Sequence, residues 1–135
     1  MSEDESMSDP MRPVAVDDAP KAIGPYAQGV VAGGFLFTAG QVPFDPATMK
    51  IVEGDIAVQT ARVLDNLEAV LRGAGCKLTD VVKATVYLAD LGDFAEMNRV
   101  YAERMGEHRP ARSTVQVAKL PAGARIEIDF VARVP

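Results

Sequence analysis

The sequence of 135 residues is poor in the side chains used for covalent and metal-assisted chemistry. It contains one cysteine (Cys76), one histidine (His108) and no tryptophan. A zinc site of the usual kind needs several Cys or His ligands, so the composition argues against one. A Ser-His-Asp triad would depend on His108, which lies in the turn MGEHRP, where we expect a solvated side chain. No Gly-rich phosphate loop and no GxGxxG after a strand occurs, so we expect no metal and no other cofactor.

Long apolar runs are also missing. No stretch reaches the roughly 18 apolar residues that a membrane span needs. The first ten residues, MSEDESMSDP, lack the basic start and apolar centre of a signal peptide. A single cysteine forms no intramolecular disulfide, which is typical of a reducing compartment. We therefore expect a cytoplasmic protein without a membrane partner.

Positive charge is scarce at the start of the chain and balanced elsewhere. Residues 1–18 hold six acidic residues and one basic residue, Arg12, which gives −5. The remainder holds 19 − 6 = 13 acidic and 14 − 1 = 13 basic residues, so its net charge is zero. A neutral folded part argues against a nucleic-acid partner. Residues 1–12 lack apolar periodicity and predict a disordered acidic tail, which leaves residues 13–135 as a single domain.

The apolar pattern predicts a sheet and two helices. Gly33-Gly34 between two β-rich runs predicts a hairpin, and Val81–Leu88, β-branched on both faces, predicts a central strand. Asp55 is the expected N-cap of a helix of about 20 residues, and Asp93 opens a capping box before a second helix. A core-facing stripe is expected on each helix. On the first it consists of Ile56, Thr60, Leu64, Leu67, Leu71 and Ala74, and on the second of Phe94, Met97, Tyr101 and Met105. We predict the α+β class, with a mixed sheet covered on one face by both helices.

The stretch Ala111–Ala132 contains two alternating runs around Leu120-Pro121-Ala122-Gly123, which predict a hairpin or close connection. The alternation places Arg112 and Glu127 on polar faces, so both are expected on one side of the sheet. A guanidinium near a carboxylate suits a small anionic substrate. Pairing around the turn would set Arg112 opposite about Val131, on the order of 13 Å from Glu127, so the two side chains need not touch.

Four motifs in order resemble one known family. They are Ile23-Gly24-Pro25-Tyr26-Ala27-Gln28-Gly29, Ala39-Gly40-Gln41-Val42-Pro43, Asp65-Asn66-Leu67, and Pro110-Ala111-Arg112-Ser113 with Leu120-Pro121 and Ile126-Glu127-Ile128-Asp129. From about Val16 to Val134 the chain resembles the RidA/YjgF/UK114 family. The resemblance implies a chorismate-mutase-like fold and a homotrimer with sites between subunits. It also implies an enamine/imine deaminase that converts intermediates such as 2-aminoacrylate to 2-keto acids and ammonia without a metal.

The resemblance also implies roles for individual residues. Arg112 would hold the substrate carboxylate, and Tyr26 would close the pocket. Glu127 would orient the attacking water or accept its proton, and then help ammonia leave. Substrate contacts would come from residues around them: Ala39, Gly40, Asn98 and Thr114. The family often has serine at the position of Ala39 and cysteine at that of Thr114, so any hydroxyl contact at Ala39 is lost and only backbone contacts carry over there.

Other interpretations stay open at this point. Without the resemblance, Arg112 would be interpreted as a surface ion-pair residue, Tyr26 as an aromatic that anchors its loop, and Asn98 as a capping or packing amide. Two functions from other classes are a translation-inhibiting endoribonuclease and a non-catalytic trimer that binds small carboxylates or protects other proteins. The lack of a second histidine argues against the ribonuclease, whereas carboxylate binding would use the same Arg112.

Overall fold

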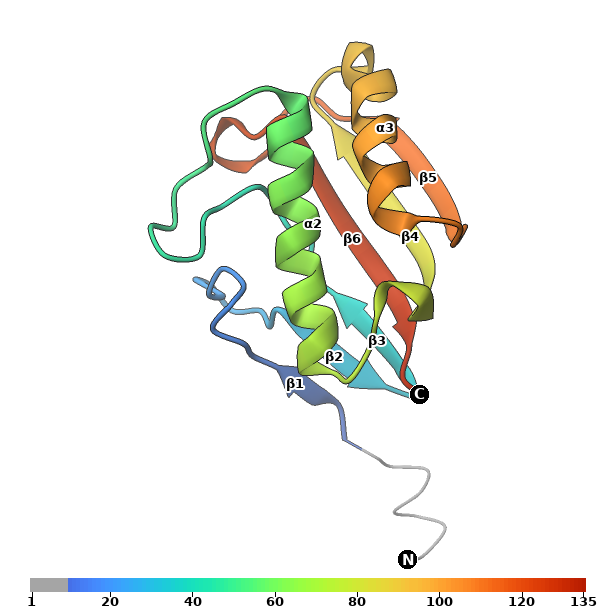
Figure 1. Cartoon of the computed structure of the whole chain (residues 1–135). Coiled ribbons are helices and arrows are strands. Elements are labelled where there is room, and N and C mark those ends of the chain that lie inside the picture. The colour runs from blue at the N-terminus through green and yellow to red at the C-terminus, as the bar shows by residue number, and fades with distance from the viewer. Residues whose placement is uncertain (1–9) are drawn as a thin grey trace, which may run out of the picture.

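A six-stranded mixed sheet with two helices on one face forms the fold, in a computed structural model that describes residues 10–135 (Figure 1). The strands are β1 (Arg12–Val14), β2 (Gly29–Ala32), β3 (Phe35–Thr38), β4 (Val81–Leu88), β5 (Ala111–Gln116) and β6 (Ile126–Arg133). The helices are α2 (Ile56–Gly73) and α3 (Phe94–Met105), with 3-10 turns η1 (Leu78–Asp80), η2 (Leu91–Asp93) and η3 (Pro121–Gly123). The predicted α+β arrangement of a mixed sheet with two helices is confirmed.

The predicted N-terminal tail needs a corrected boundary. Residues 1–9 lie outside the described residues. Arg12 already belongs to β1, where it pairs with Val31, and Val14 in the same strand is buried. The ladder to β2 and the burial of Val14 therefore place the start of the sheet at Arg12, one residue inside the predicted tail.

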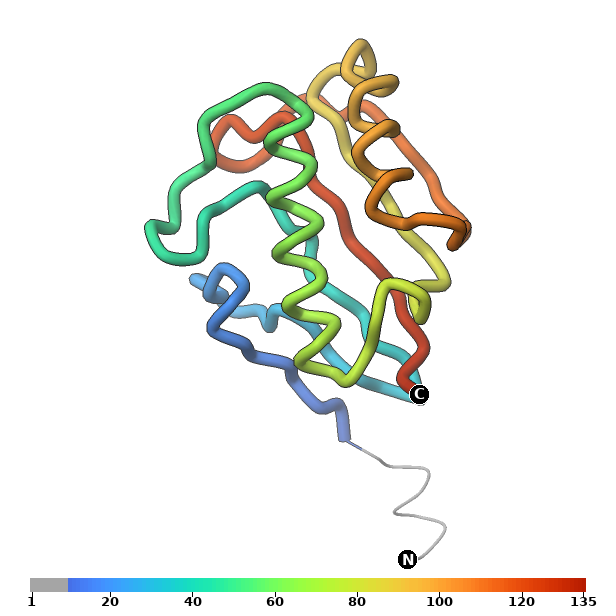
Figure 2. The backbone as a smooth tube through the Cα atoms, viewed as in Figure 1, coloured from blue at the N-terminus to red at the C-terminus, as the bar shows by residue number. Residues whose placement is uncertain are grey.

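Strand β4 lies between β6 and β5 in the order β1-β2-β3-β6-β4-β5, so the predicted hairpin of the last two runs is wrong. β5 pairs with β4 in parallel, and β6 pairs with β4 antiparallel. The segment after β5 crosses the end of β4, where Val117 N donates to Leu88 O at 2.9 Å and Ala89 N donates to Arg125 O at 3.1 Å (Figure 2). The central position predicted for β4 is confirmed, and it separates the two runs.

The hairpin between β2 and β3 has the expected two-residue turn. Gly33 and Gly34 have φ values of 60° and 82°. A turn with positive φ at both positions matches the twist of paired strands and favours glycine. The register Val31↔Leu36 then points Leu36 into the layer under α2.

Both helices begin where the sequence predicts. The Asp55 carboxylate caps α2 by accepting from Val58 N at 3.0 Å, and the predicted apolar stripe is buried: Ile56, Thr60, Leu64, Leu67, Leu71 and Ala74. The capping box predicted for α3 does not form. Asp93 makes no cap bond because its two oxygens accept from Arg125 Nη2 at 2.8 and 3.0 Å. No helix in residues 10–135 is long and apolar enough to cross a membrane.

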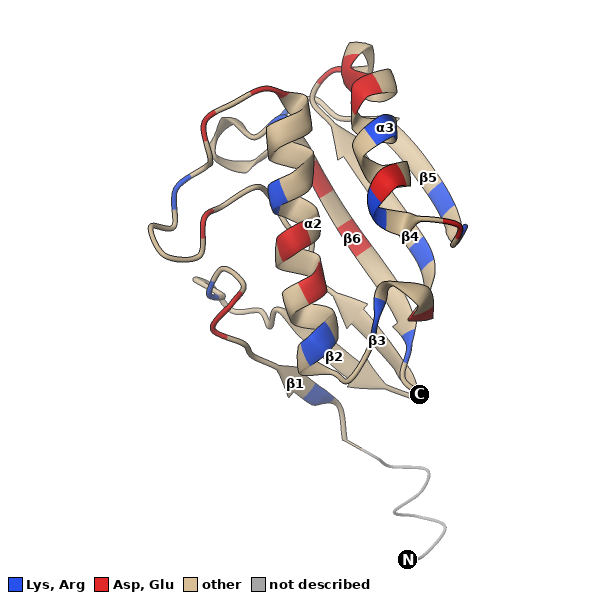
Figure 3. Cartoon of the chain, viewed as in Figure 1, with Lys and Arg blue, Asp and Glu red and all other residues tan. Residues whose placement is uncertain are grey.

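The two faces of the sheet differ in cover. Apolar side chains of β3, β4 and β6 are buried under the helices, among them Leu36, Ala84, Val86, Leu88, Ile126, Ile128, Phe130 and Ala132. Within residues 10–135 no helix covers the opposite face, and large apolar side chains of its strands remain exposed: Phe35, Phe37 and Val115. Charged residues of both signs are spread over the chain, with acidic bands on β6 (Figure 3). One face of the sheet is therefore a core and the other is open.

His108 is half-buried, so its predicted solvated position is wrong. Its Nε2 lies 2.7 Å from Val81 O, which requires a proton on Nε2 because a carbonyl only accepts. Val81 lies beside a β-bulge in β4, where the register to β6 shifts between Val81 and Lys83. The ring therefore ties the turn before β5 to this irregular end of β4.

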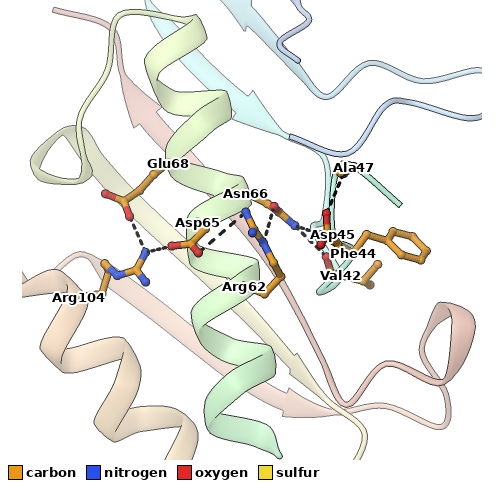
Figure 4. A network of polar contacts seen from close by, with 9 residues as sticks. All are labelled: Val42, Phe44, Asp45, Ala47, Arg62, Asp65, Asn66, Glu68 and Arg104. Atoms are coloured by element: carbon orange, nitrogen blue, oxygen red, sulfur yellow. Dashed lines mark hydrogen bonds and ion pairs between the residues drawn. The ribbon is translucent and has the colours of Figure 1, made fainter. Parts of the chain in front are cut away.

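A polar network connects α3, α2 and the loop after β3 (Figure 4). Arg104 on α3 pairs with Asp65 at 2.9 Å and with Glu68 at 2.6 Å. On the other side of α2, the fully buried Asn66 donates from Nδ2 to Phe44 O at 3.0 Å and to Val42 O at 3.4 Å. Its Oδ1 accepts from Arg62 Nε at 3.1 Å. Asn66, from the motif Asp65-Asn66-Leu67, thus fixes the backbone that follows Gly40.

We predict that Asn66→Asp destabilises the fold although it hardly changes the side-chain volume. A carboxylate would face the carbonyls of Val42 and Phe44: Phe44 O would lose its donor, whereas Val42 O would keep only the bond from Phe44 N. The expected loss is about 2–4 kcal/mol in the free energy of unfolding, measured by urea at one fixed protein concentration. Asp65→Asn is the matched control, because the Asp65 side chain is 47% exposed and its ion pair is worth less than about 1 kcal/mol. Equal effects of the two changes would contradict this role of Asn66.

Candidate active site

The residues predicted for the site lie in two separate groups. Arg112, Thr114 and Asn98 lie where β5 meets α3, and Asn98 and Arg112 line one hollow. Gly40 and Glu127 lie together where the segment after β3 runs beside β6, with Ala39 and Tyr26 nearby. We call these the arginine half-site and the glutamate half-site.

The strand register sets the two half-sites on opposite faces of the sheet. Phe130, Ala84 and Arg112 lie side by side on β6, β4 and β5, and the first two are buried under the helices. Glu127 precedes Phe130 by three residues, an odd number, so it points to the open face. Two strand spacings and three residues separate Arg112 from Glu127 by about 14 Å between Cα atoms. The expectation that both share one side of the sheet is therefore wrong for a single chain.

Two aromatic rings of the α3 region fix Arg112. The guanidinium carbon lies 4.7 Å from the centre of the Tyr101 ring and 5.6 Å from that of Phe94. No carboxylate in residues 10–135 forms an ion pair with Arg112, whereas Arg62, Arg99, Arg104 and Arg125 all have such partners. A guanidinium stacked on rings keeps its N–H edge available for a planar anion. The arrangement suits a carboxylate ligand better than a surface ion pair.

The arginine half-site also holds polar groups without a partner. The hydroxyls of Tyr101 and Thr114 are buried and make no hydrogen bond within residues 10–135. Tyr101 is only 6% exposed, and burial raises the pKa of its hydroxyl while the charges of Arg112 and Arg109 oppose that rise. The apolar pattern of α3 predicts Tyr101 as core and gives no sign of its hydroxyl. Its contact with Arg112 depends on the parallel pairing of β5 with β4.

In the glutamate half-site, backbone and carboxylate are in close contact. A Cβ on Gly40 would overlap Glu127 Oε2 and lie 2.7 Å from Glu127 Cδ, so a side chain at this position would displace the carboxylate. The amides on either side are bonded: Ala39 N donates to Gln28 O at 2.9 Å and Gln41 N donates to Ile128 O at 2.8 Å. Gly40 N has no backbone acceptor within residues 10–135. An exposed glycine N–H beside a carboxylate is available to a ligand.

The surroundings of Glu127 raise the pKa of its carboxyl group. Burial raises the pKa of the Glu127 carboxyl, and the negative charge of Asp129 raises it further. Burial also raises the pKa of Asp129, while the Tyr87 hydroxyl, which donates to Asp129 Oδ2 at 3.1 Å, lowers it. A carboxyl with a raised pKa is better matched to accepting and returning a proton near neutral pH.

Tyr26 is 53% exposed at the edge of the glutamate half-site. Its ring packs against Gly24, and its hydroxyl accepts from Ile23 N at 3.4 Å. With Gly40 and Gln41 it lines a small cavity of about 50 Å³. Buried Gln28 shapes this loop by donating to Pro20 O at 2.8 Å and accepting from Val16 N at 2.7 Å. Tyr26 thus lies where a side chain could cover a ligand, and it also anchors its loop.

Metal ligands do not converge in the part of the chain that the structure describes. Residues 10–135 contain no group of three His, Cys, Asp or Glu side chains placed to hold an ion. The groups available for chemistry are therefore a stacked guanidinium with neighbouring hydroxyl and amide groups, and a carboxylate beside a glycine amide. Such groups are chemically suited to binding a small carboxylate and to transferring protons.

Several known proteins are similar to this chain in sequence and in fold. A RutC family protein of Pyrococcus horikoshii is 55% identical over 119 residues, which cover 88% of this chain and 94% of that protein. A 2-iminobutanoate/2-iminopropanoate deaminase of Escherichia coli is 46% identical over 122 residues, 88% of this chain and 94% of its own. The crystal structure of E. coli TdcF with bound serine superposes with a TM-score of 0.86 at 42% identity and covers 90% of this chain and 98% of that one.

The family profile described as Endoribonuclease L-PSP matches residues 16–134, almost the whole described chain. The matched span contains both half-sites, and the relatives are similar over nearly their full length. The chain therefore belongs to the endoribonuclease L-PSP family, the RidA/YjgF/UK114 family that its four motifs resemble.

Proposed function

We propose that the protein is an enamine/imine deaminase that hydrolyses 2-imino acids, such as the imine of 2-aminoacrylate, to 2-keto acids and ammonia. The observation that carries this proposal is Arg112, whose guanidinium is stacked on two rings and has no carboxylate partner within residues 10–135. The 46% identical E. coli relative with this activity supports the assignment. The ligand class also fits TdcF, which binds serine, a small amino acid with a carboxylate.

The proposed reaction needs positioning and one proton-transfer group. Arg112 holds the substrate carboxylate by two parallel hydrogen bonds, and Asn98 and Thr114 lie beside it. Water adds to the C=N carbon as Glu127 accepts its proton. Glu127 then returns this proton to nitrogen and transfers the proton of the new hydroxyl group to the same nitrogen, so that ammonia leaves as the C=O bond forms. The N–H of Gly40 and the ring of Tyr26 complete the pocket. Imines of this kind hydrolyse unaided, so positioning and a few hydrogen bonds suffice.

We further propose that the site forms between subunits of a ring-shaped homotrimer. One chain holds Arg112 and Glu127 on opposite faces of its sheet, so one substrate contacts both only if a second copy supplies one of them. The open face supports such packing, since it exposes Phe35, Phe37 and Val115. Contacts between unlike surfaces close into rings, and a ring gives each arginine half-site a partner.

An endoribonuclease is the second candidate, because the family profile carries that description. General-base cleavage of RNA usually employs histidine, and the single His108 is bonded to Val81 O. The net charge of −5 gives no electrostatic attraction to RNA. A carboxylate-binding trimer without catalysis would use the same Arg112. Acceleration of ammonia release from 2-aminoacrylate above the uncatalysed rate separates the deaminase from both alternatives.

We predict that Arg112→Lys keeps the fold and lowers imine hydrolysis. Lysine retains the charge but does not present two coplanar donors. Loss of one charge-assisted hydrogen bond, worth about 1.5–3 kcal/mol, lowers kcat/KM about ten- to a hundredfold. Keto-acid formation from enzymatically generated 2-aminoacrylate measures the rate, and circular dichroism checks the fold. Arg99→Lys on the exposed side of α3 is the control and should keep its rate. Wild-type turnover by folded Arg112→Lys protein would contradict the assignment.

We predict that Gly40→Ala lowers turnover more than it lowers stability. The new methyl group would overlap Glu127 Oε2 and Cδ, and the flexible carboxylate end can move away at small cost. Displaced general bases cost about 10²–10⁴-fold in rate. Gly92→Ala is the matched control, because its methyl group would lie 3.1 Å from Asp90 Oδ1 in a surface turn. Steady-state kinetics and thermal melts of both variants test this; an unchanged rate in Gly40→Ala would remove Glu127 from the reaction.

A further inference from the structure

A second arginine lies beside the one that is assigned to the substrate carboxylate. The hollow of about 420 Å³ at the arginine half-site is lined by Asn98, Tyr101, Ala102, Arg109, Pro110 and Arg112. Neither arginine has an ion-pair partner within residues 10–135. Two like charges in one hollow repel each other, and an anion that contacts both relieves this repulsion.

Arg109 is held in place by the backbone. Its Nη1 donates to Gly106 O and to His108 O, the latter at 2.9 Å, and His108 is in turn bonded to Val81 O. These bonds occupy one nitrogen of the guanidinium and leave the others as donors. The turn between α3 and β5 therefore presents a fixed second cation three residues before Arg112.

The buried Tyr101 hydroxyl marks the same hollow as a ligand site. Tyr101 is 6% exposed, and its hydroxyl has no hydrogen-bond partner within residues 10–135. An unpaired buried hydroxyl is unfavourable, so a ligand that bonds it gains affinity. Both guanidinium charges act on this hydroxyl. The hollow thus combines two cations with a tyrosine whose buried hydroxyl has no partner within residues 10–135.

We propose that the preferred substrate is a 2-imino acid whose side chain ends in a second carboxylate, with Arg112 binding the carboxylate next to the imine and Arg109 binding the distal one. This inference rests on the proposed deaminase function and names its substrate class. A dicarboxylate satisfies both cations and still leaves the C=N carbon open to water. Hydrolysis adds one water, forms C=O and releases ammonia, so no further reactant is needed.

The test compares a dicarboxylic and a monocarboxylic imine in the intact protein. The probes are 2-iminosuccinate, made in situ by oxidising aspartate, and 2-iminobutanoate. We expect kcat/KM to be at least about tenfold higher for 2-iminosuccinate, as one additional charge-assisted hydrogen bond allows. Arg109→Gln should reduce the ratio of the two kcat/KM values to near one. Arg72→Gln, an exposed arginine outside the hollow, removes the same charge and should leave the ratio unchanged.

Calorimetry with stable ligands separates this inference from the proposed function. Succinate should bind at least about tenfold more tightly than butyrate, and Arg109→Gln should remove the difference. Equal rates for both imines together with equal affinities would overturn the dicarboxylate preference and leave the deaminase intact. If neither imine is hydrolysed, the deaminase proposal fails, and the ratio of the two affinities then decides whether the hollow binds dicarboxylates. A ratio that falls equally in Arg72→Gln would reduce the effect to general charge and overturn the role of Arg109.

Discussion

The pairing of β4 with both β5 and β6 determines which side of the sheet each functional residue occupies. β4 keeps the two C-terminal runs apart, and its register places Arg112 in one row with buried Ala84 and Phe130. Since side chains alternate along a strand, Glu127 then points to the open face. The separation follows from strand order, register and alternation together, and no rotamer change within one chain removes it. A shared site therefore requires a second copy of the chain.

Contacts with neighbouring side chains and backbone give each half-site its shape. Aromatic rings hold the Arg112 guanidinium, and the absence of a Cβ at Gly40 makes room for the Glu127 carboxylate. Further from the chemistry, Asn66 fixes the backbone after Gly40, and His108 ties the turn before β5 to β4. Residues outside the two half-sites thus position the elements that carry them.

Much of the fold followed from local sequence signals, and the site did not. Gly33-Gly34, the Asp55 cap and the stripe of α2 are local patterns, and each predicts its element correctly. The hairpin around Leu120–Gly123 failed because pairing partners depend on the whole sheet, and β4 competes successfully for both runs. The prediction of a capping box failed because the Asp93 carboxylate accepts hydrogen bonds from Arg125, 32 residues away, instead of from the backbone of α3. The proposed roles of Arg112 and Glu127 came from the resemblance of the motifs to a known family. Alternation alone predicted that both side chains lie on one face of the sheet, which the strand register contradicts.

Subunit complementation tests the central claim, that one site combines Arg112 of one subunit with Glu127 of another. Arg112→Ala and Glu127→Gln are each expected to be inactive, and the two are refolded together in equal amounts. In a ring, about a quarter of the sites then combine an intact Arg112 with an intact Glu127 from the neighbour. The account predicts recovery of about a quarter of wild-type imine hydrolysis in the mixture. A mixture as inactive as the separate variants, with mixed oligomers verified by mass, would contradict it.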